Sequence, residues 1–542
     1  MNSNSIPVSD TAEQHTLEKS TNVHTTSPKW FMPLFLAVLI ATVTYIGFQL
    51  SADLSNIPSL SFYSVILLAA ALMVALGFEF VNGFHDTANA VATVIYTNAL
   101  PASVAVMWAG FCNFLGVMVA SGAVAYGIIA LLPVELIMNV SSGAGFAMVF
   151  AMLLAAIIWN LGTWFLGIPA SSSHTMIGSI LGVAVMNYLL SSGNGSNVDM
   201  DQVLKVGKAL LFSPLIGFAF AAVVFLLVKT VLKKKLELFQ PPEGNKPPPP
   251  VIRALLIFTC TGVSFAHGSN DGQKGMGLIM LILIGLVPLA YSLNKNLDTN
   301  QLQSFGQLSG QTALVLDTQK QFNLSDDQAR SVITKYIQTK EINPEVIPAL
   351  ATLTHQLGEH VGQYGYVKDI PENEVSVIRN DMYLSTSAFK RLEKAKQLPA
   401  MSESQTKTVK EYRKSLDAFL QYIPTWVKVA VALALGLGTM VGWKRIVVTV
   451  GERIGKNHMT YGQGMSAELV AMTTIAAADG LGMPVSTTHV LNSAVAGTMV
   501  ANKSGLNFNT VKMILSAWIF TLPATIMLSG CLYWLFLQFV AK

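Results

Sequence analysis

Two copies of a polar motif lie inside apolar stretches of this 542-residue chain. Residues 82–89 read Asn-Gly-Phe-His-Asp-Thr-Ala-Asn, and residues 267–274 read His-Gly-Ser-Asn-Asp-Gly-Gln-Lys. Each copy places an acid, Asp86 or Asp271, in an apolar segment, where an ionised carboxylate in hydrocarbon costs at least about 2.5 kcal/mol. We therefore expect both carboxylates to face a partner or water.

The glycines beside these acids permit a helix break, after which each Asp would begin a half-helix. Residues i and i+3 share a helix face, which pairs Asp86 with Asn89 and Asp271 with Lys274. A helix cap without a transport role is the competing interpretation. Two copies at membrane depth favour ion coupling, and we assign these four residues to it.

A second duplicated motif is rich in hydroxyls: Ala-Ser-Ser-Ser-His at 170–174 and Val-Ser-Thr-Thr-His at 485–489. Each copy follows a proline that is compatible with the first turn of a new half-helix. Helix N-termini offer free N–H groups and partial positive charge, so an oxyanion fits there. Ser and Thr also join membrane helices to one another, but the duplication favours ligand binding. The predicted substrate ligands are Ser171, Ser172, Ser173, Ser486, Thr487, Thr488 and Asn270.

Histidines and further acids accompany the motifs. Neutral His is easily switched near physiological pH, so the four motif histidines could relay a proton, although a lone His is usually structural. Glu79 and Glu468 are acids in apolar surroundings, where ion coupling and a structural pair are both open. We add His267 and Glu468 to the predicted ion-coupling set. The four motif histidines are His85, His174, His267 and His489.

The elements that position these motifs must be membrane helices. The chain is 52% hydrophobic and only 12% charged, with a mean hydropathy of +0.50, which excludes a soluble multidomain protein. A net charge of +4 is too small for a nucleic-acid footprint. Three single cysteines have no zinc or redox spacing, so neither a metal cluster nor a disulfide framework is expected. Residues 1–29 are polar and lack a secretory signal pattern.

Eight apolar stretches are long enough, at roughly 20 residues, to cross a bilayer. We expect an all-α polytopic fold of two inverted repeats, with broken helices, re-entrant hairpins and a helical soluble insert. The stretches are 31–50, 62–81, 104–131, 145–166, 209–232, 252–290, 425–443 and 512–540.

The spacing of the two motifs reveals the domain organisation. The acid motif recurs after 185 residues and the hydroxyl motif after 315, so the second half carries about 130 extra residues. These form a polar, amphipathic tract with mixed charge. The predicted parts are a polar tail (1–29), the first repeat with a leading transmembrane helix (30–232), a basic Pro-rich linker (233–250), the start of the second repeat (251–293), the insert (294–422) and the rest of the second repeat (423–542).

Basic residues near the membrane predict the topology, because cytoplasmic loops collect Lys and Arg. The central linker carries Lys233, Lys234 and Lys235, and the loop after 425–443 carries Lys444 and Arg445, so both are expected inside. The insert then lies outside, the N-terminal tail inside and the C-terminal end outside. Matched motifs enter from opposite sides, which is an inverted repeat.

At these motifs the chain resembles the Pit family of inorganic phosphate transporters, most closely its bacterial low-affinity branch. The resemblance includes residues 83–90, 268–275, 167–174 and 482–489, and also 157–165 and 438–445. It implies an all-helical symporter of inverted repeats that carries phosphate with a cation. The family's motif aspartates match Asp86 and Asp271, its motif serines match Ser171 and Ser486, and its second-half glutamate matches Glu468.

The resemblance also bears on the coupling ion. The first-half acid of the sodium-dependent members falls at Asn113, which is neutral. Bacterial relatives are associated with proton coupling and with phosphate carried as a neutral complex with a divalent metal. Lys274 stands where the first copy has Asn89, and its ammonium could occupy the place of a bound sodium. We therefore expect a proton, in preference to sodium, as the coupling cation.

The prediction is a multi-pass inner-membrane symporter of inorganic phosphate that works by alternating access, as a homodimer and without a cofactor. Sodium-coupled phosphate transport and an arsenate or sulfate symporter are the nearest alternatives. A passive anion channel is disfavoured because an anion pore would be lined by positive charge. A membrane-anchored receptor is the alternative from another class. Nothing resembles an acyl- or phosphoryl-transfer site, so an enzyme is not expected.

Overall fold

The computed structural model describes residues 29–55, 57–58, 60–132, 134–138, 140, 142–191, 200–242, 246–317 and 324–540, with only the backbone at 87–89, 134–135 and 540. Within these ranges every regular element is a helix, apart from one isolated bridge between Gly455 and Leu506. The predicted all-α fold is confirmed.

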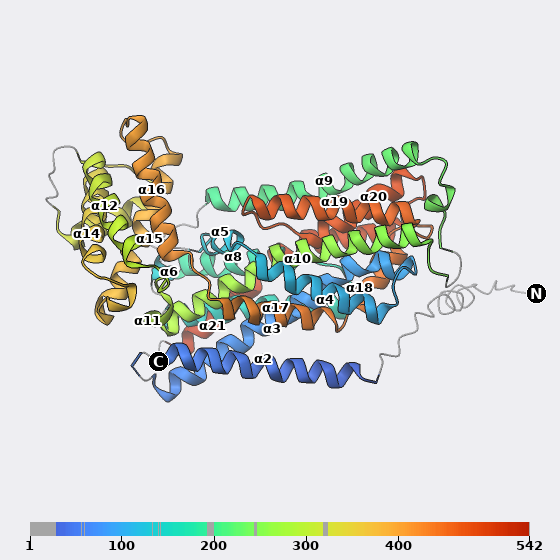
Figure 1. The fold of residues 1–542 in the computed structure, drawn as a ribbon, viewed down its shortest axis with the longest axis horizontal. Coiled ribbons are helices and arrows are strands. Elements are labelled where there is room, and N and C mark those ends of the chain that lie inside the picture. Colours follow the sequence, from blue (N-terminus) through green and yellow to red (C-terminus); the bar gives the residue numbers. More distant parts are fainter. Residues whose placement is uncertain are drawn as a thin grey trace, which may run out of the picture.

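Eight described helices are long and apolar enough to cross a membrane, which makes the protein a multi-pass membrane protein. They run side by side along the length of the molecule (Figure 1). A ninth span is possible at α17 (Thr425–Thr439). This helix reaches the required length and hydropathy only when it is joined to the preceding helix, from which it is bent by 64°. The eight are α2 (Phe31–Leu54), α3 (Phe62–Tyr96), α4 (Ala102–Val119), α7 (Gly143–Phe165), α8 (Ser172–Leu190), α9 (Met200–Val231), α10 (Pro250–Leu286) and α21 (Phe508–Val540).

The predicted helix breaks at the acid motifs are wrong, because α3 and α10 run through them without interruption. The glycines serve close packing instead. A Cβ on Gly83 would lie 2.2 Å from the carbonyl oxygen of Leu435 on α17, and a Cβ on Gly268 would lie 2.2 Å from that of Asn113 on α4. Each acid is thus fixed where its own helix is pressed against a neighbour.

Two helical hairpins carry the hydroxyl motifs. One consists of α7 and α8, and the other of α19 (Tyr461–Gly480) and α20 (Thr487–Ala501). The predicted stretch 104–131 is divided, since Gly122 adopts φ 89° between α4 and the short α5 (Ala123–Ile129). The short elements of the membrane part are α6 (Val134–Met138), η1 (Leu236–Phe239), α11 (Pro288–Tyr291), α18 (Lys444–Val448) and η3 (Thr449–Arg453).

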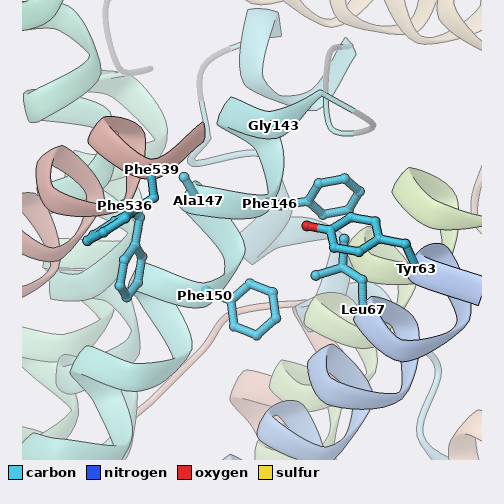
Figure 2. Close-up of a pocket in the computed structure, with 8 residues that line it drawn as sticks. All are labelled: Tyr63, Leu67, Gly143, Phe146, Ala147, Phe150, Phe536 and Phe539. Atoms are coloured by element: carbon cyan, nitrogen blue, oxygen red, sulfur yellow. The ribbon is translucent and has the colours of Figure 1, made fainter. Parts of the chain in front are cut away.

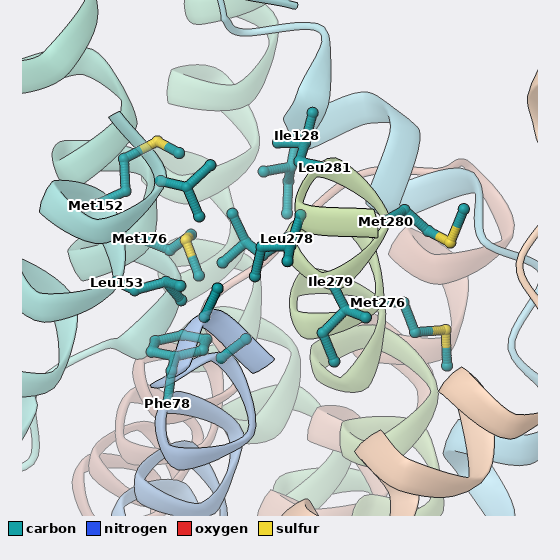
Figure 3. Packing of buried hydrophobic residues seen from close by; sticks show 14 of the residues in the cluster. Phe78, Ile128, Met152, Leu153, Met176, Met276, Leu278, Ile279, Met280 and Leu281 are labelled. Carbon is teal, nitrogen blue, oxygen red and sulfur yellow. The ribbon is translucent and has the colours of Figure 1, made fainter. Parts of the chain in front are cut away.

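The largest apolar cluster among the described residues surrounds the C-terminal half of α10. Figure 3 shows Met276, Leu278 and Leu281 of this helix among side chains such as Phe78 of α3 and Met176 of α8. Inside a bilayer, burial from lipid gives little hydrophobic gain, so close van der Waals packing must hold these helices. This packing fixes the part of α10 that directly follows the segment carrying Asp271.

The predicted insert folds around an apolar core of its own, in which the rings of Phe305, Tyr412 and Phe419 are in contact. Three of its helices begin with a capping box, in which a Ser or Asp cap is followed three residues later by Gln. The insert lies at one end of the bundle (Figure 1). Its elements are α12 (Thr299–Leu316), α13 (Asp326–Thr339), α14 (Val346–Gly362), η2 (Val367–Asp369), α15 (Glu372–Lys394) and α16 (Glu403–Leu420).

The insert is closed at its stem, and α15 contacts the bundle. At its stem, Asn294 N donates to the carbonyl oxygen of Phe419 at 3.0 Å, so the chain enters and leaves the insert at neighbouring points. On α15, Arg379 donates to the carbonyl oxygen of Ile137 at 3.3 Å, and Lys394 lies 3.0 Å from Asp201 of α9.

Candidate functional site

Asp86 lies in the interior of α3 and is buried. Its carboxylate accepts hydrogen bonds from Ser172 Oγ on α8 and from Thr488 Oγ1 on α20. His85 Nδ1 is 3.3 Å from the same carboxylate. The two hydroxyl donors come from the two predicted anion motifs, so the structure joins the first acid motif to both of them.

Asp271 lies in an ionic environment on α10. Lys274 Nζ is 2.7 Å from Asp271 Oδ2, as their i, i+3 spacing predicts, and His267 Nε2 is 3.5 Å away. The ammonium also donates to Ser173 Oγ at 2.5 Å, and Ser173 in turn donates to the carbonyl oxygen of Val485 at 2.6 Å. Asp271 and Lys274 are fully buried, and Asp271 Oδ1 has no hydrogen-bond partner among the described residues.

The N-termini of α8 and α20 converge beside these acids. Ser171 caps α8 by accepting from the backbone N–H of His174 at 3.2 Å, and Ser486 caps α20 by accepting from that of His489 at 3.1 Å. The two imidazole rings lie 4.4 Å apart, centroid to centroid. In each motif the proline precedes the cap by two residues, so it lies outside the helix and not in its first turn as predicted.

Thr487 and Asn270 lie beside the same helix start. Thr487 Oγ1 is buried and has no partner among the described residues. Asn270 donates through Nδ2 to the carbonyl oxygen of Met483 at 3.1 Å, and its Oδ1 accepts from Val485 N at 3.5 Å. In this structure Asn270 therefore binds the loop before α20, which leaves Thr487 as the open donor.

One predicted coupling residue, Glu468, is not brought to this cluster. Glu468 of α19 is buried, and its Oε2 accepts from Thr259 Oγ1 at 2.5 Å. Thr259 precedes Asp271 by twelve residues on α10, about 18 Å along the helix axis. The Asn89 side chain lies outside the described residues, so its pairing with Asp86 stays a prediction.

Several residues of the cluster were not assigned from the sequence. Asn113 of α4 accepts a hydrogen bond from His267 Nδ1 through its Oδ1 at 2.9 Å, and it donates through Nδ2 to Thr439 Oγ1 at 3.0 Å. Thr163 of α7 was also not assigned, and its Oγ1 is 3.1 Å from Nε2 of His85, one of the four motif histidines. The sequence identifies Asn113 only as a neutral residue at the position of a family acid. Its contacts depend on the packing of α4 against α10, which no local pattern indicates.

The two acid motifs meet closely enough to hold a cation. Asp86, His267 and Asp271 each offer one ligand atom, and these atoms lie within 4.8 Å of one another. Carboxylate oxygen and imidazole nitrogen suit a divalent metal or a shared proton. Lys274 already supplies one positive charge to this group.

An apolar groove on the outer surface of the bundle is a different feature. Figure 2 shows it between α3, α7 and α21, lined by aromatic side chains such as Phe146 and Phe539. It has no charged lining residue, so it has none of the chemistry of the cluster around Asp86 and Asp271.

The long apolar helices enclose two acids, a lysine and hydroxyls from both halves of the chain, which is the arrangement of a multi-pass membrane transporter. The chain belongs to the phosphate transporter family, whose sequence model matches residues 82–529. This family membership agrees with the expectation that the protein is not an enzyme.

The chain is similar to several named relatives over most of its length. The low-affinity inorganic phosphate transporters PitA and PitB of Escherichia coli are 42% and 41% identical, over 89% of this chain and 99% of theirs. A low-affinity inorganic phosphate transporter of Buchnera aphidicola is 40% identical, over 87% of this chain and 96% of its own. A solved sodium-dependent phosphate transporter covers 87% of this chain and 99% of its own, with 18% identity and a TM-score of 0.47.

Proposed function

We propose that the protein takes up inorganic phosphate across the inner membrane as a proton symporter, by alternating access between two inverted repeats. The observation that carries this proposal is the convergence of both acid motifs and both hydroxyl motifs on one buried cluster. Inorganic phosphate is proposed as the substrate because relatives more than 40% identical over nearly their whole length are named inorganic phosphate transporters.

Phosphate would bind between the N-termini of α8 and α20. Backbone N–H groups at these helix starts and the open Thr487 hydroxyl offer donors to the phosphate oxygens. Ser172 and Thr488 now donate to Asp86, and they would turn to the anion when it enters. Asp86 could then accept a hydrogen bond from a P–OH group, which selects a protonated phosphate.

Lys274 favours the proton over sodium as the coupling ion. Its ammonium lies 2.7 Å from Asp271 and so occupies the space in which a cation would bind that carboxylate. A divalent metal that travels with phosphate as a neutral complex would find ligands in Asp86, His267 and Asp271. Neutralising phosphate before it leaves water lowers the electrostatic cost of entry.

The parts of the chain keep the organisation predicted above, with the insert outside and the basic linker inside. The folded core of the insert and its single stem support treating it as a separate unit. We keep Glu468 as a coupling candidate at a second position, beside Thr259. We also expect the assembly to be a homodimer.

The test is radiolabelled phosphate uptake by the full chain in proteoliposomes, under an inward proton gradient, with and without sodium and magnesium. We expect proton-driven, sodium-independent accumulation that Asp271→Asn abolishes. Strict sodium dependence would refute proton coupling, and uptake without any gradient-driven accumulation would favour a channel. Competition by arsenate and sulfate decides between phosphate and another oxyanion.

A further inference from the structure

Glu79 is a buried acid that the proposed substrate site does not use. It lies on α3, seven residues before Asp86, and its side chain is 0% exposed. Its Oε2 accepts one hydrogen bond, a long one of 3.4 Å from Asn82 Nδ2. Its Oε1 has no partner among the described residues. The carboxyl group is therefore poorly solvated by the protein in its ionised form.

The side chain is pressed against α10 directly beside the substrate cluster. A Cβ on Gly275 would lie 2.3 Å from Glu79 Cγ and 2.4 Å from Oε1, so only a glycine leaves room for the carboxyl. The charged groups that act on it are Lys274 and Asp271, both on α10. The helices α4 and α7, which also pack on α3, carry no acidic or basic residue, and Lys428 of α17 donates to the carbonyl oxygen of Ala120.

We propose that Glu79 is the residue that binds the coupling proton within the membrane. The inference rests on the proposed proton symport and assigns that proton to one carboxyl group. Lys274 precedes Gly275, against which the Glu79 carboxyl is packed, so its charge stabilises an ionised Glu79, and its ammonium also contacts Asp271 and Ser173. When the phosphate anion attracts Lys274, the Glu79 carboxylate loses this stabilisation and takes up a proton from the outer solution to become a neutral carboxylic acid.

The return step balances the charge. Release of phosphate to the cytoplasm gives Lys274 back to the acids, and Glu79 then returns its proton to the cytoplasmic side as an ionised carboxylate. Phosphate binding and proton binding thus stabilise each other through one lysine, and each lowers the cost of the other.

Two further observations favour Glu79 over the motif acids. Asp86 accepts two hydroxyl donors and Asp271 has the lysine at 2.7 Å, so each of these acids already has partners for its carboxylate. The position equivalent to Glu79 in the second acid motif, 185 residues later, is Ser264, which is buried with no partner for Oγ among the described residues. The second acid motif therefore has no carboxyl group at the position equivalent to Glu79, which lies on the outer side of Asp86 in the predicted topology.

The experiment compares two transport modes of the full-length protein in proteoliposomes. Glu79→Gln should lower proton-driven phosphate accumulation at least tenfold. The same variant should keep phosphate–phosphate exchange at equal pH on both sides, and that exchange should lose its pH dependence. Ser264→Ala, the matched change in the second half, should leave both modes and the pH profile unchanged. Proton-driven accumulation by Glu79→Gln at the wild-type level would overturn the proposal, as would uncoupling by Glu468→Gln alone.

A second variant covers the case in which Glu79→Gln does not fold. Asn82→Ala removes the side-chain hydrogen bond to the ionised carboxylate, so the midpoint of the transport pH profile should move to higher pH; an unmoved midpoint would contradict the role of Glu79. If the wild-type protein itself responds to a sodium gradient and not to a proton gradient, the proposed symport is wrong. If instead the wild-type protein is driven by protons and Glu79→Gln keeps this coupling, the proposed symport stands and only the assignment of the proton to Glu79 is refuted.

Discussion

The two acid motifs have the same origin in sequence pattern but different surroundings in the structure. Asp86 is held by hydroxyls from α8 and α20, without a basic partner of the Lys or Arg type among its described contacts. Asp271 is paired with Lys274 and carries an oxygen that no described group satisfies. The two motifs thus share a sequence pattern but differ in their surroundings, with hydroxyl donors around the first acid and a lysine beside the second.

Among the variants that test this difference, Asp86→Asn should cause the largest loss of phosphate uptake. Hydrogen bonds to a charged group are worth about 1.5–3 kcal/mol each, so weakening two of them should reduce phosphate uptake about 100-fold or more. Uptake of radiolabelled phosphate, normalised to the protein found in the membrane, measures this loss. Near-normal uptake would mean that Asp86 is only a structural acceptor for the two hydroxyls.

Lys274→Asn should have the next largest effect, because it makes the second copy resemble the first. Breaking a buried ion pair costs about 3–5 kcal/mol, so we expect a lower Tm and at least tenfold slower uptake without sodium. Sodium should then partly restore transport by binding Asp271. A variant that stays fully active and independent of sodium would show that the ammonium does not replace a cation.

Ser172→Ala and Ser173→Ala should have smaller effects on transport, and they should affect phosphate binding and proton coupling separately. Ser172 donates to Asp86 and Ser173 contacts Lys274, although the two are neighbours on one helix turn. We expect Ser172→Ala to raise the KM for phosphate about tenfold and Ser173→Ala to change chiefly the response to the proton gradient. Identical kinetics of the two variants would remove the distinction between the copies.

The smallest effects should come from the caps. Ser171→Ala and Ser486→Ala each remove one N-cap hydrogen bond, worth about 1 kcal/mol of stability. Thermal unfolding in detergent should show small decreases in Tm of similar size for the two variants. A loss of phosphate binding that far exceeds the loss of stability would instead make these hydroxyls direct ligands of the substrate.

Local patterns in the sequence predicted part of the site well. The i, i+3 spacing gave the contact of Asp271 with Lys274, and the Ser-rich motifs gave the helix starts at α8 and α20. The same logic failed at Gly83 and Gly268, since a glycine in an apolar run permits either a break or a close helix contact, and only the neighbouring helix decides.

Contacts between distant segments could not be predicted. Thr488 reaches Asp86 across 402 residues of sequence, and Asn113 reaches His267 across 154. Both contacts depend on how separate helices pack, which no window of the sequence records. Glu468 illustrates the converse case, because its acid type and apolar setting resemble those of Asp271 while its helix places it beside Thr259.

The stem of the insert is a site at which another folded domain could replace the insert. Asn294 and Phe419 share a backbone hydrogen bond, so about 125 residues leave and rejoin the bundle at one spot between α11 and α17. A reporter domain with neighbouring termini, such as a compact fluorescent protein, meets the same end-to-end requirement. The insert can therefore be exchanged for another folded domain at this point while the spacing of the bundle helices is kept.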